Sequence, residues 1–127
     1  MRVLYVDDDR VNAVLFAEAC SVAGGVDIEC AGSGAEAHEL LAAFVPDLLV
    51  IDLHLPDTSG DRLLTQLRRD LARDVPAFLC TAEPDAVGRA AAAAAGFDGC
   101  WSKPIDMQAI IGELRRRAAA VGPTRSS

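Results

Sequence analysis

The sequence predicts an α/β fold, a doubly wound sheet of five parallel strands. Apolar runs of strand length alternate along the chain with segments whose apolar residues recur at spacings of three and four, and five such pairs fit into the 127 residues. The strand-length runs are continuously apolar, which indicates strands that are buried on both faces. Strands that alternate with helices are joined by right-handed parallel crossovers, and five such units give a doubly wound sheet.

The five strands are predicted from these apolar runs, and the last of them has the weakest signal. They are Val3 to Val6, Val26 to Cys30, Leu48 to Ile51, Ala77 to Cys80, and Gly99 to Ser102.

The first two helices have clear start and stop signals. Asp9 is a candidate N-cap for the first helix, and Gly24-Gly25 closes it. Ser33 and Glu36 form a capping-box pattern that opens the second helix, which must stop before Pro46. The predicted buried stripes are Val11, Val14, Leu15, Ala19 and Val22 in the first helix, and Ala37, Leu40, Leu41 and Phe44 in the second.

The remaining three helices follow from the same spacing. The fourth runs through Val87 and Ala90 to Ala95, and Asp106 starts the fifth. The marker residues are Leu63, Leu64, Leu67 and Leu71 for the third helix, and Met107, Ile110, Ile111 and Leu114 for the fifth.

The length suits one domain, which we expect over residues 1–120, with residues 121–127 as a disordered tail. No apolar run approaches the roughly 18 residues of a membrane span, and a strand-like segment follows Met1 without a signal-peptide pattern. We therefore expect a cytoplasmic protein without membrane association.

Charge and cysteine spacing exclude two further classes. Nineteen acidic against twelve basic residues give a net charge of −7, which argues against nucleic-acid binding by this domain alone. The cysteines show no CxxC spacing and lie in apolar segments, so they are interpreted as small core residues and not as a zinc site or disulfide framework.

Polar residues that can do chemistry stand at the carboxyl ends of four predicted strands. Each alone fits a helix cap, a turn or a solvated side chain, and Asp9 is expected to be only a cap. Together they occupy the edge where doubly wound folds bind ligands. Carboxylates within a few ångströms repel by about 4 kcal/mol per pair at an effective dielectric of about 20, which a hard cation such as Mg²⁺ would relieve. The residues are Asp7 and Asp8, then Asp52, Thr81 and Lys103.

Four short motifs surround these positions. They are Leu4-Tyr5-Val6-Asp7-Asp8-Asp9, Asp47 to Asp52 with Leu55-Pro56 and Gly60, Cys80-Thr81-Ala82, and Trp101 to Asp106. In this order and spacing the chain resembles a response-regulator receiver domain, the phosphoacceptor module of two-component signalling. The resemblance implies a flavodoxin-like (βα)5 fold with strand order 2-1-3-4-5.

The resemblance also implies a role for each site residue. Asp52 resembles the phosphorylated aspartate, Thr81 the hydroxyl residue and Lys103 the cation that contact the phosphoryl oxygens. The implied Mg²⁺ ligands are Asp7, Asp8, Asp52 and the backbone carbonyl of His54. Such a domain is not an enzyme, because it catalyses only its own phosphoryl transfer and autodephosphorylation.

Three residues are expected to modulate this chemistry. His54 and Glu83 occupy the positions that tune the lifetime of the phosphorylated state in the family. Cys100 stands where most receivers carry Tyr or Phe, which alters the usual conformational readout. Trp101 should face the opposite side of the sheet and pack there.

The predicted function is therefore that of a phosphoacceptor in a His-Asp phosphorelay, served by a sensor histidine kinase or a histidine phosphotransfer protein. The chain is a stand-alone regulator or the receiver of a hybrid kinase, and a monomer or weak dimer. The alternative is a degenerate receiver that acts only as an interaction module. A third class, the aspartyl-phosphate hydrolases of the haloacid-dehalogenase type, also uses an aspartate at a strand end. Those proteins need a second acid two residues later, and His54 at that position argues against this class.

Overall fold

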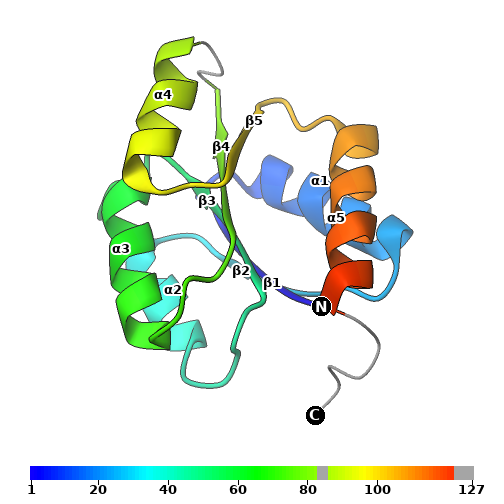
Figure 1. The fold of residues 1–127 in the computed structure, drawn as a ribbon, viewed down its shortest axis with the longest axis horizontal. Coiled ribbons are helices and arrows are strands. Elements are labelled where there is room, and N and C mark those ends of the chain that lie inside the picture. Colours follow the sequence, from blue (N-terminus) through cyan, green and yellow to red (C-terminus); the bar gives the residue numbers. More distant parts are fainter. Residues whose placement is uncertain (83–85, 122–127) are drawn as a thin grey trace.

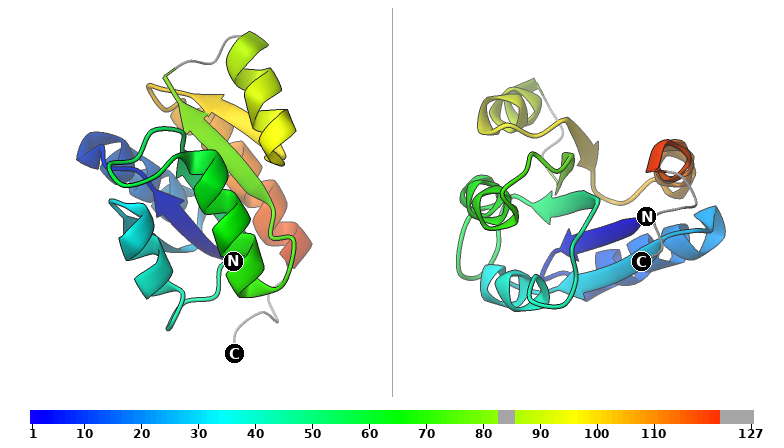
Figure 2. Two further views of the ribbon diagram at one scale, coloured as in Figure 1. Left: turned by 90° about the vertical axis from the view of Figure 1, so that its left-hand side faces the viewer. Right: turned by 60° about the horizontal axis from the view of Figure 1, so that its bottom comes forward.

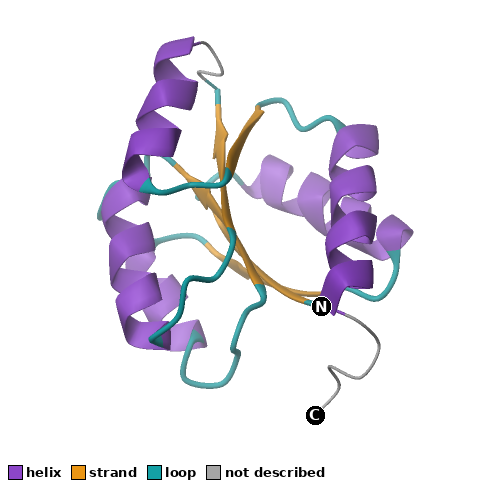
Figure 3. Cartoon of the chain, viewed as in Figure 1, coloured by secondary structure: helices purple, strands orange, loops and turns teal. Residues whose placement is uncertain are grey.

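A computed structural model describes residues 1–82 and 86–121 of the chain. It contains a five-stranded parallel sheet in the order β2-β1-β3-β4-β5 (Figures 1 and 3), which confirms the predicted fold class and strand order. The elements are β1 (Arg2–Val6), α1 (Arg10–Ala23), β2 (Asp27–Ala31), α2 (Gly34–Leu40), β3 (Leu48–Asp52), α3 (Gly60–Leu71), β4 (Ala77–Thr81), α4 (Ala86–Ala95), β5 (Gly99–Ser102) and α5 (Met107–Val121).

Helices cover both faces of the sheet (Figure 2). Helices α1 and α5 lie on one face, and α2, α3 and α4 on the other. Strands β1, β3 and β4 are therefore almost completely buried, as their continuous apolar sequences predict. None of the helices within the described ranges is both long and apolar enough to cross a membrane.

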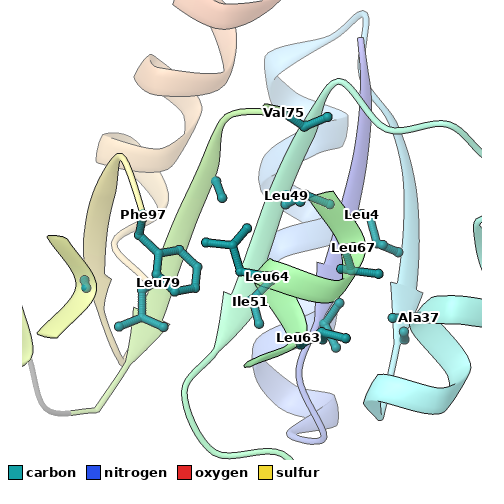
Figure 4. Packing of buried hydrophobic residues seen from close by; sticks show 14 residues of the cluster. Leu4, Ala37, Leu49, Ile51, Leu63, Leu64, Leu67, Val75, Leu79 and Phe97 are labelled. Atoms are coloured by element: carbon teal, nitrogen blue, oxygen red, sulfur yellow. The ribbon is translucent and has the colours of Figure 1, made fainter. Parts of the chain in front are cut away.

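Helix α3 shows how the leucine spacing sets the packing (Figure 4). Leu63, Leu64 and Leu67 lie on one side of the helix and are buried against Ile51 and Leu79 of the sheet. Burying each leucine contributes about 2 kcal/mol relative to leaving it exposed. This packing fixes the position of the loop that leads from β3 into α3.

Helix α1 packs through a different face from the one predicted. Val11 and Val14 are each 69% exposed, while Phe16 and Cys20 are buried. The aromatic ring of Phe16 stacks on Tyr5 at a centroid distance of 4.5 Å, and this large contact sets the rotation of the helix. The predicted stripe was therefore wrong for its three valines, whereas Ala19 is buried and Leu15 packs against the core as predicted. The Asp9 cap is confirmed by hydrogen bonds from the amides of residues 11 and 12.

Other differences from the sequence analysis are local. Strand β2 is at the edge of the sheet, so most of it is not buried, and Cys30 is exposed instead of being a core residue. Helix α2 ends at Leu40, and Phe44 packs from the turn that follows. Helix α5 includes Val121, which the prediction had placed in the tail; residues 122–127 lie outside the described part of the chain.

Side-chain hydrogen bonds tie together the amino-terminal ends of the strands. The guanidinium of Arg68 donates to the carbonyl oxygens of Val75 at 2.9 Å and Gly96 at 2.8 Å. The carboxylate of Asp98 accepts from the amide of Ala77 at 2.9 Å. These contacts anchor β4 and β5 at the edge opposite the predicted site.

Candidate functional site

Three aspartates from two strand ends meet at the carboxyl edge of the sheet. β1 and β3 pair in parallel with Val6 opposite Ile51, so Asp7 and Asp52 emerge side by side. Each of Asp7, Asp8 and Asp52 offers a carboxylate oxygen within 4.8 Å of those of the other two. Asp7 and Asp52 are buried, whereas Asp8 is exposed and faces solvent. The predicted convergence of these side chains is therefore present.

Lys103 reaches into this cluster from the end of β5. Its ammonium lies 2.9 Å from Asp7 Oδ2 and 3.4 Å from Asp52 Oδ2. Burial lowers the pKa of Lys103, but the hydrogen bond to Asp7 and the two carboxylate charges outweigh it, so the pKa is raised and the side chain stays cationic. The Lys103 amide donates to the carbonyl of Thr81 at 2.8 Å, which places the fully buried end of β4 beside the cluster.

The electrostatic balance at Asp52 disfavours its charge. Burial raises the pKa of this carboxyl, and the nearby Asp7 carboxylate adds to the effect, while Lys103 and the amide of Leu53 oppose it. The net direction is upward, so the surroundings make the ionised form of Asp52 less favourable than it is in water. A cation bound at this carboxylate would relieve the imbalance.

Tyr5 is a member of the site that the sequence analysis missed. Its hydroxyl donates a hydrogen bond to Asp7 Oδ2 at 2.9 Å from a fully buried position. Burial, with further contributions from Cys80 and Asp7, raises the pKa of Tyr5, so the hydroxyl is a proton donor. The available signal was a tyrosine in an otherwise aliphatic strand, two residues before the first aspartate.

The loop after Asp52 is held at both ends. The Asp57 carboxylate accepts hydrogen bonds from the amides of Gly34 and Ala35, both at 2.9 Å, which tie the loop to the start of α2. These hydrogen bonds hold the pKa of Asp57 below its ordinary value. At the other end Gly60 lies so close to the backbone carbonyl of Asp52 that a side chain at this position would collide with it.

The predicted modulating residues have different surroundings. His54 is exposed on the loop after β3, and Glu83 lies outside the described residues. Cys100 is half-buried and packs against the core cluster under α4. Trp101 packs on the opposite face, 4.6 Å from the Phe78 ring, as predicted from strand alternation.

The donor set fits a hard divalent cation. Carboxylate oxygens are the ligands that Mg²⁺ prefers, and the exposed Asp8 leaves room for the water ligands that Mg²⁺ retains. Asp7 and Asp52 are buried carboxyl groups, and a bound cation would compensate the cost of placing carboxylate charges where water is scarce. The cluster is typical of the metal site of receiver domains.

The chain is similar to response regulators in both its sequence and its structure. A family model described as the response regulator receiver domain matches residues 3–115. The response regulator MprA of Mycobacterium leprae (strain TN) is 34% identical over 115 residues, which are 91% of this chain and 50% of MprA. The chain therefore spans about half the length of the curated relatives it matches.

Solved structures share the fold over nearly their whole length. The non-phosphorylated HemR receiver domain from Leptospira biflexa is 27% identical, with a TM-score of 0.76 and coverage of 96% of this chain and 97% of that one. A two-component response regulator from Clostridium difficile has a TM-score of 0.83, with coverage of 96% and 98%. Its identity is 19%, so that likeness concerns the fold alone.

Proposed function

Because the chain belongs to the response regulator receiver domain family, we propose that Asp52 is the side chain that accepts its phosphoryl group. The observation that carries this proposal is the joint placement of Asp52, its acidic neighbours and Lys103. The Asp52 carboxylate is a nucleophile at the mouth of a buried strand, next to two carboxylates and one ammonium. In this family the partner is a cognate histidine kinase.

The proposed reaction is an in-line displacement at phosphorus. An oxygen of Asp52 attacks the phosphorus of a phosphohistidine, the new P–O bond forms as the P–N bond breaks, and the electron pair leaves on the imidazole nitrogen. The Lys103 ammonium pairs with one phosphoryl oxygen, and the Thr81 hydroxyl donates to another. Water later hydrolyses the acyl phosphate and restores Asp52, so the domain catalyses only reactions of its own carboxylate, and the family is not one of enzymes.

Asp7, Asp8 and Asp52 would hold Mg²⁺ in this scheme, with the backbone carbonyl of His54 as a further ligand. When bound, the cation supplies positive charge for the oxygens of the transferred group. The fold brings the carboxylates together before the phosphodonor binds. The reaction therefore does not have to supply the entropy loss of arranging them, and its barrier is lower.

His54 and Glu83 are proposed to set the lifetime of the acyl phosphate. The exposure of His54 supports this role, because a side chain on the outer face of the loop can border the path of the attacking water. Cys100 lacks the aromatic ring that most receivers have at its position, so we propose that the conformational signal on the α4 side differs from the usual one.

The immediate donor is a sensor kinase or a histidine phosphotransfer protein, and the chain is a stand-alone regulator or the receiver part of a hybrid kinase. A cytoplasmic location belongs to the proposal, because a kinase that charges its histidine from ATP works in that compartment. The receiver domain is proposed to extend to the end of α5 at Val121, one residue beyond the predicted boundary, and a monomer or weak dimer suffices for the reaction.

The test is labelling with a small phosphodonor such as acetyl phosphate in the presence of Mg²⁺. Wild-type protein should gain an acid-stable, base-labile phosphoryl group, which the Asp52→Asn variant should not gain. The control is Asp74→Asn. Asp74 is exposed in the loop before β4, at the opposite end of that strand from the cluster, so this variant should take the label normally.

Two results would contradict the proposal. A label that persists in Asp52→Asn would place the phosphoryl group on another residue. A wild-type protein that is folded, binds Mg²⁺ and takes no label from either the small donor or a phosphorylated kinase would favour the degenerate receiver that serves as an interaction module.

A further inference from the structure

The carboxylate of Asp7 is held by donors on both of its oxygens. Oδ1 accepts a hydrogen bond from the Asp9 amide at 2.9 Å. Oδ2 accepts one from the Tyr5 hydroxyl at 2.9 Å and is also 2.9 Å from the Lys103 ammonium. The two lone pairs of Oδ2 are therefore shared between a phenol and a lysine.

These two donors differ in their freedom to move. Lys103 has a long, flexible side chain that is already divided between two carboxylates, at 2.9 Å from Asp7 and 3.4 Å from Asp52. In the proposed reaction it turns to the phosphoryl group, which frees one lone pair of Asp7 Oδ2. The Tyr5 hydroxyl then remains as the donor on that oxygen.

Tyr5 cannot follow, because aromatic packing fixes its ring. Tyr5 and Phe16 are both fully buried and stack with an interplanar angle of 20°. The Phe16 ring lies 6.1 Å from Trp101, which stacks on Phe78 at 4.6 Å. The guanidinium of Arg117 lies 4.9 Å from the Phe78 ring centre and extends this aromatic column to α5. The phenol is therefore a rigid donor whose oxygen is aimed at Asp7.

We propose that Tyr5 is a positioning residue of the metal site, whose hydroxyl keeps the Asp7 carboxylate oriented toward the cation both while Lys103 contacts that carboxylate and after Lys103 turns to the phosphoryl group. This role rests on the proposed function, since it assumes a cation bound by the aspartates. Without the hydroxyl, the carboxylate would be held at Oδ1 by the Asp9 amide and could turn about its Cβ–Cγ bond. Outer donors of this kind typically change metal affinity by about 10- to 100-fold.

The test is the Tyr5→Phe variant, which keeps the ring and removes the oxygen. Magnesium binding is measured by isothermal titration calorimetry, and the rate of labelling by acetyl phosphate is measured over a range of Mg²⁺ concentrations. We expect the Mg²⁺ dissociation constant of Tyr5→Phe to rise by about tenfold. The labelling rate should fall at low Mg²⁺ and return to within about twofold of wild type at saturating Mg²⁺, because Tyr5 does not touch the reacting atoms.

The matched control is Phe97→Leu, which removes a buried ring from the core cluster on the opposite face of the sheet and leaves the Tyr5 column intact. It should lower the melting temperature and leave the Mg²⁺ dissociation constant unchanged. The proposal is overturned if Tyr5→Phe binds Mg²⁺ with wild-type affinity, or if Phe97→Leu weakens binding as much as Tyr5→Phe does. Failure of the proposed function gives a different result, because wild-type protein would then take no label, or Asp52→Asn would keep the label, whatever the Mg²⁺ affinities of wild type and Tyr5→Phe.

Discussion

The carboxylate cluster should make the metal-free protein less stable than a variant that lacks one of its charges. The change we consider is Asp52→Asn, which keeps the size of the side chain and removes its charge. Asp52 is only 8% exposed, so its ionised form is poorly hydrated, and it lies within 4.8 Å of the Asp7 carboxylate. Its raised pKa shows that the surroundings as a whole disfavour its ionised form.

The magnitude follows from four contributions. At an effective dielectric of about 20, repulsion from the Asp7 oxygen, which lies within 4.8 Å, costs at least about 3.5 kcal/mol, and attraction to Lys103 at 3.4 Å contributes about 5 kcal/mol. Burial of the charge costs several kcal/mol more, and the solvated Asp8 adds about 1 kcal/mol of repulsion. We expect Asp52→Asn to raise the free energy of unfolding by about 2 kcal/mol, or the melting temperature by about 8 °C.

The assay is urea denaturation of both proteins at pH 8 in EDTA, which removes divalent cations. Because the folded-state pKa of Asp52 is raised, folded wild type binds a proton more readily than the unfolded chain, and wild-type stability falls as the pH rises through that pKa. The advantage of Asp52→Asn should therefore shrink as the pH is lowered toward the ordinary value of 3.8.

Asp98→Asn is the control for the loss of any carboxylate. Asp98 accepts a hydrogen bond from the Ala77 amide and lies 3.5 Å from the Arg68 guanidinium, so this variant should be no more stable than wild type. If Asp52→Asn is equally or less stable than wild type at pH 8 in EDTA, the electrostatic reasoning is refuted.

Three further results are expected. Millimolar Mg²⁺ should raise the melting temperature of wild type but not of Asp8→Ala, because the metal binds only the folded cluster; an equal rise in both would count against the site. Gly60→Ala should cost about 1–3 kcal/mol in urea denaturation and slow phosphorylation, since its Cβ collides with the Asp52 carbonyl, whereas Gly112→Ala in α5 has room and should be neutral or stabilising. Asp57→Ala should be less stable than wild type at neutral pH in thermal melts. Because the folded-state pKa of Asp57 is lowered, the ionised carboxylate stabilises the wild type at neutral pH, and this stabilisation is lost as the pH falls through that pKa. The difference between the two proteins should therefore vanish at low pH, and a difference independent of pH would contradict this reasoning.

The sequence predicted the sheet and the acidic cluster because both depend on local patterns. A buried parallel strand is a continuous apolar run, and residues that follow such runs meet at one edge in any doubly wound sheet. The strand order that the resemblance implies places β1 beside β3, and the pairing of Val6 with Ile51 in the structure brings Asp7 to Asp52. Lys103 joins them because β5 ends at the same edge.

The rotation of α1 and the role of Tyr5 depend on contacts between distant residues, which spacing along the chain does not contain. The valines Val11 and Val14 have the correct spacing for a buried stripe, but the stacking of Phe16 on Tyr5 turns them toward solvent. Tyr5 in turn is identified as a donor to Asp7 only when the fold places its hydroxyl there. Both corrections come from the same pair of rings.

The hydrogen bonds of Arg68 and Asp98 at the amino-terminal edge have a consequence for engineering this domain. These hydrogen bonds anchor the amino-terminal ends of β4 and β5, whereas the aspartates and Lys103 lie at the carboxyl ends of the strands. Substitutions that strengthen the first group can raise resistance to heat or proteolysis without altering the rate of phosphoryl transfer.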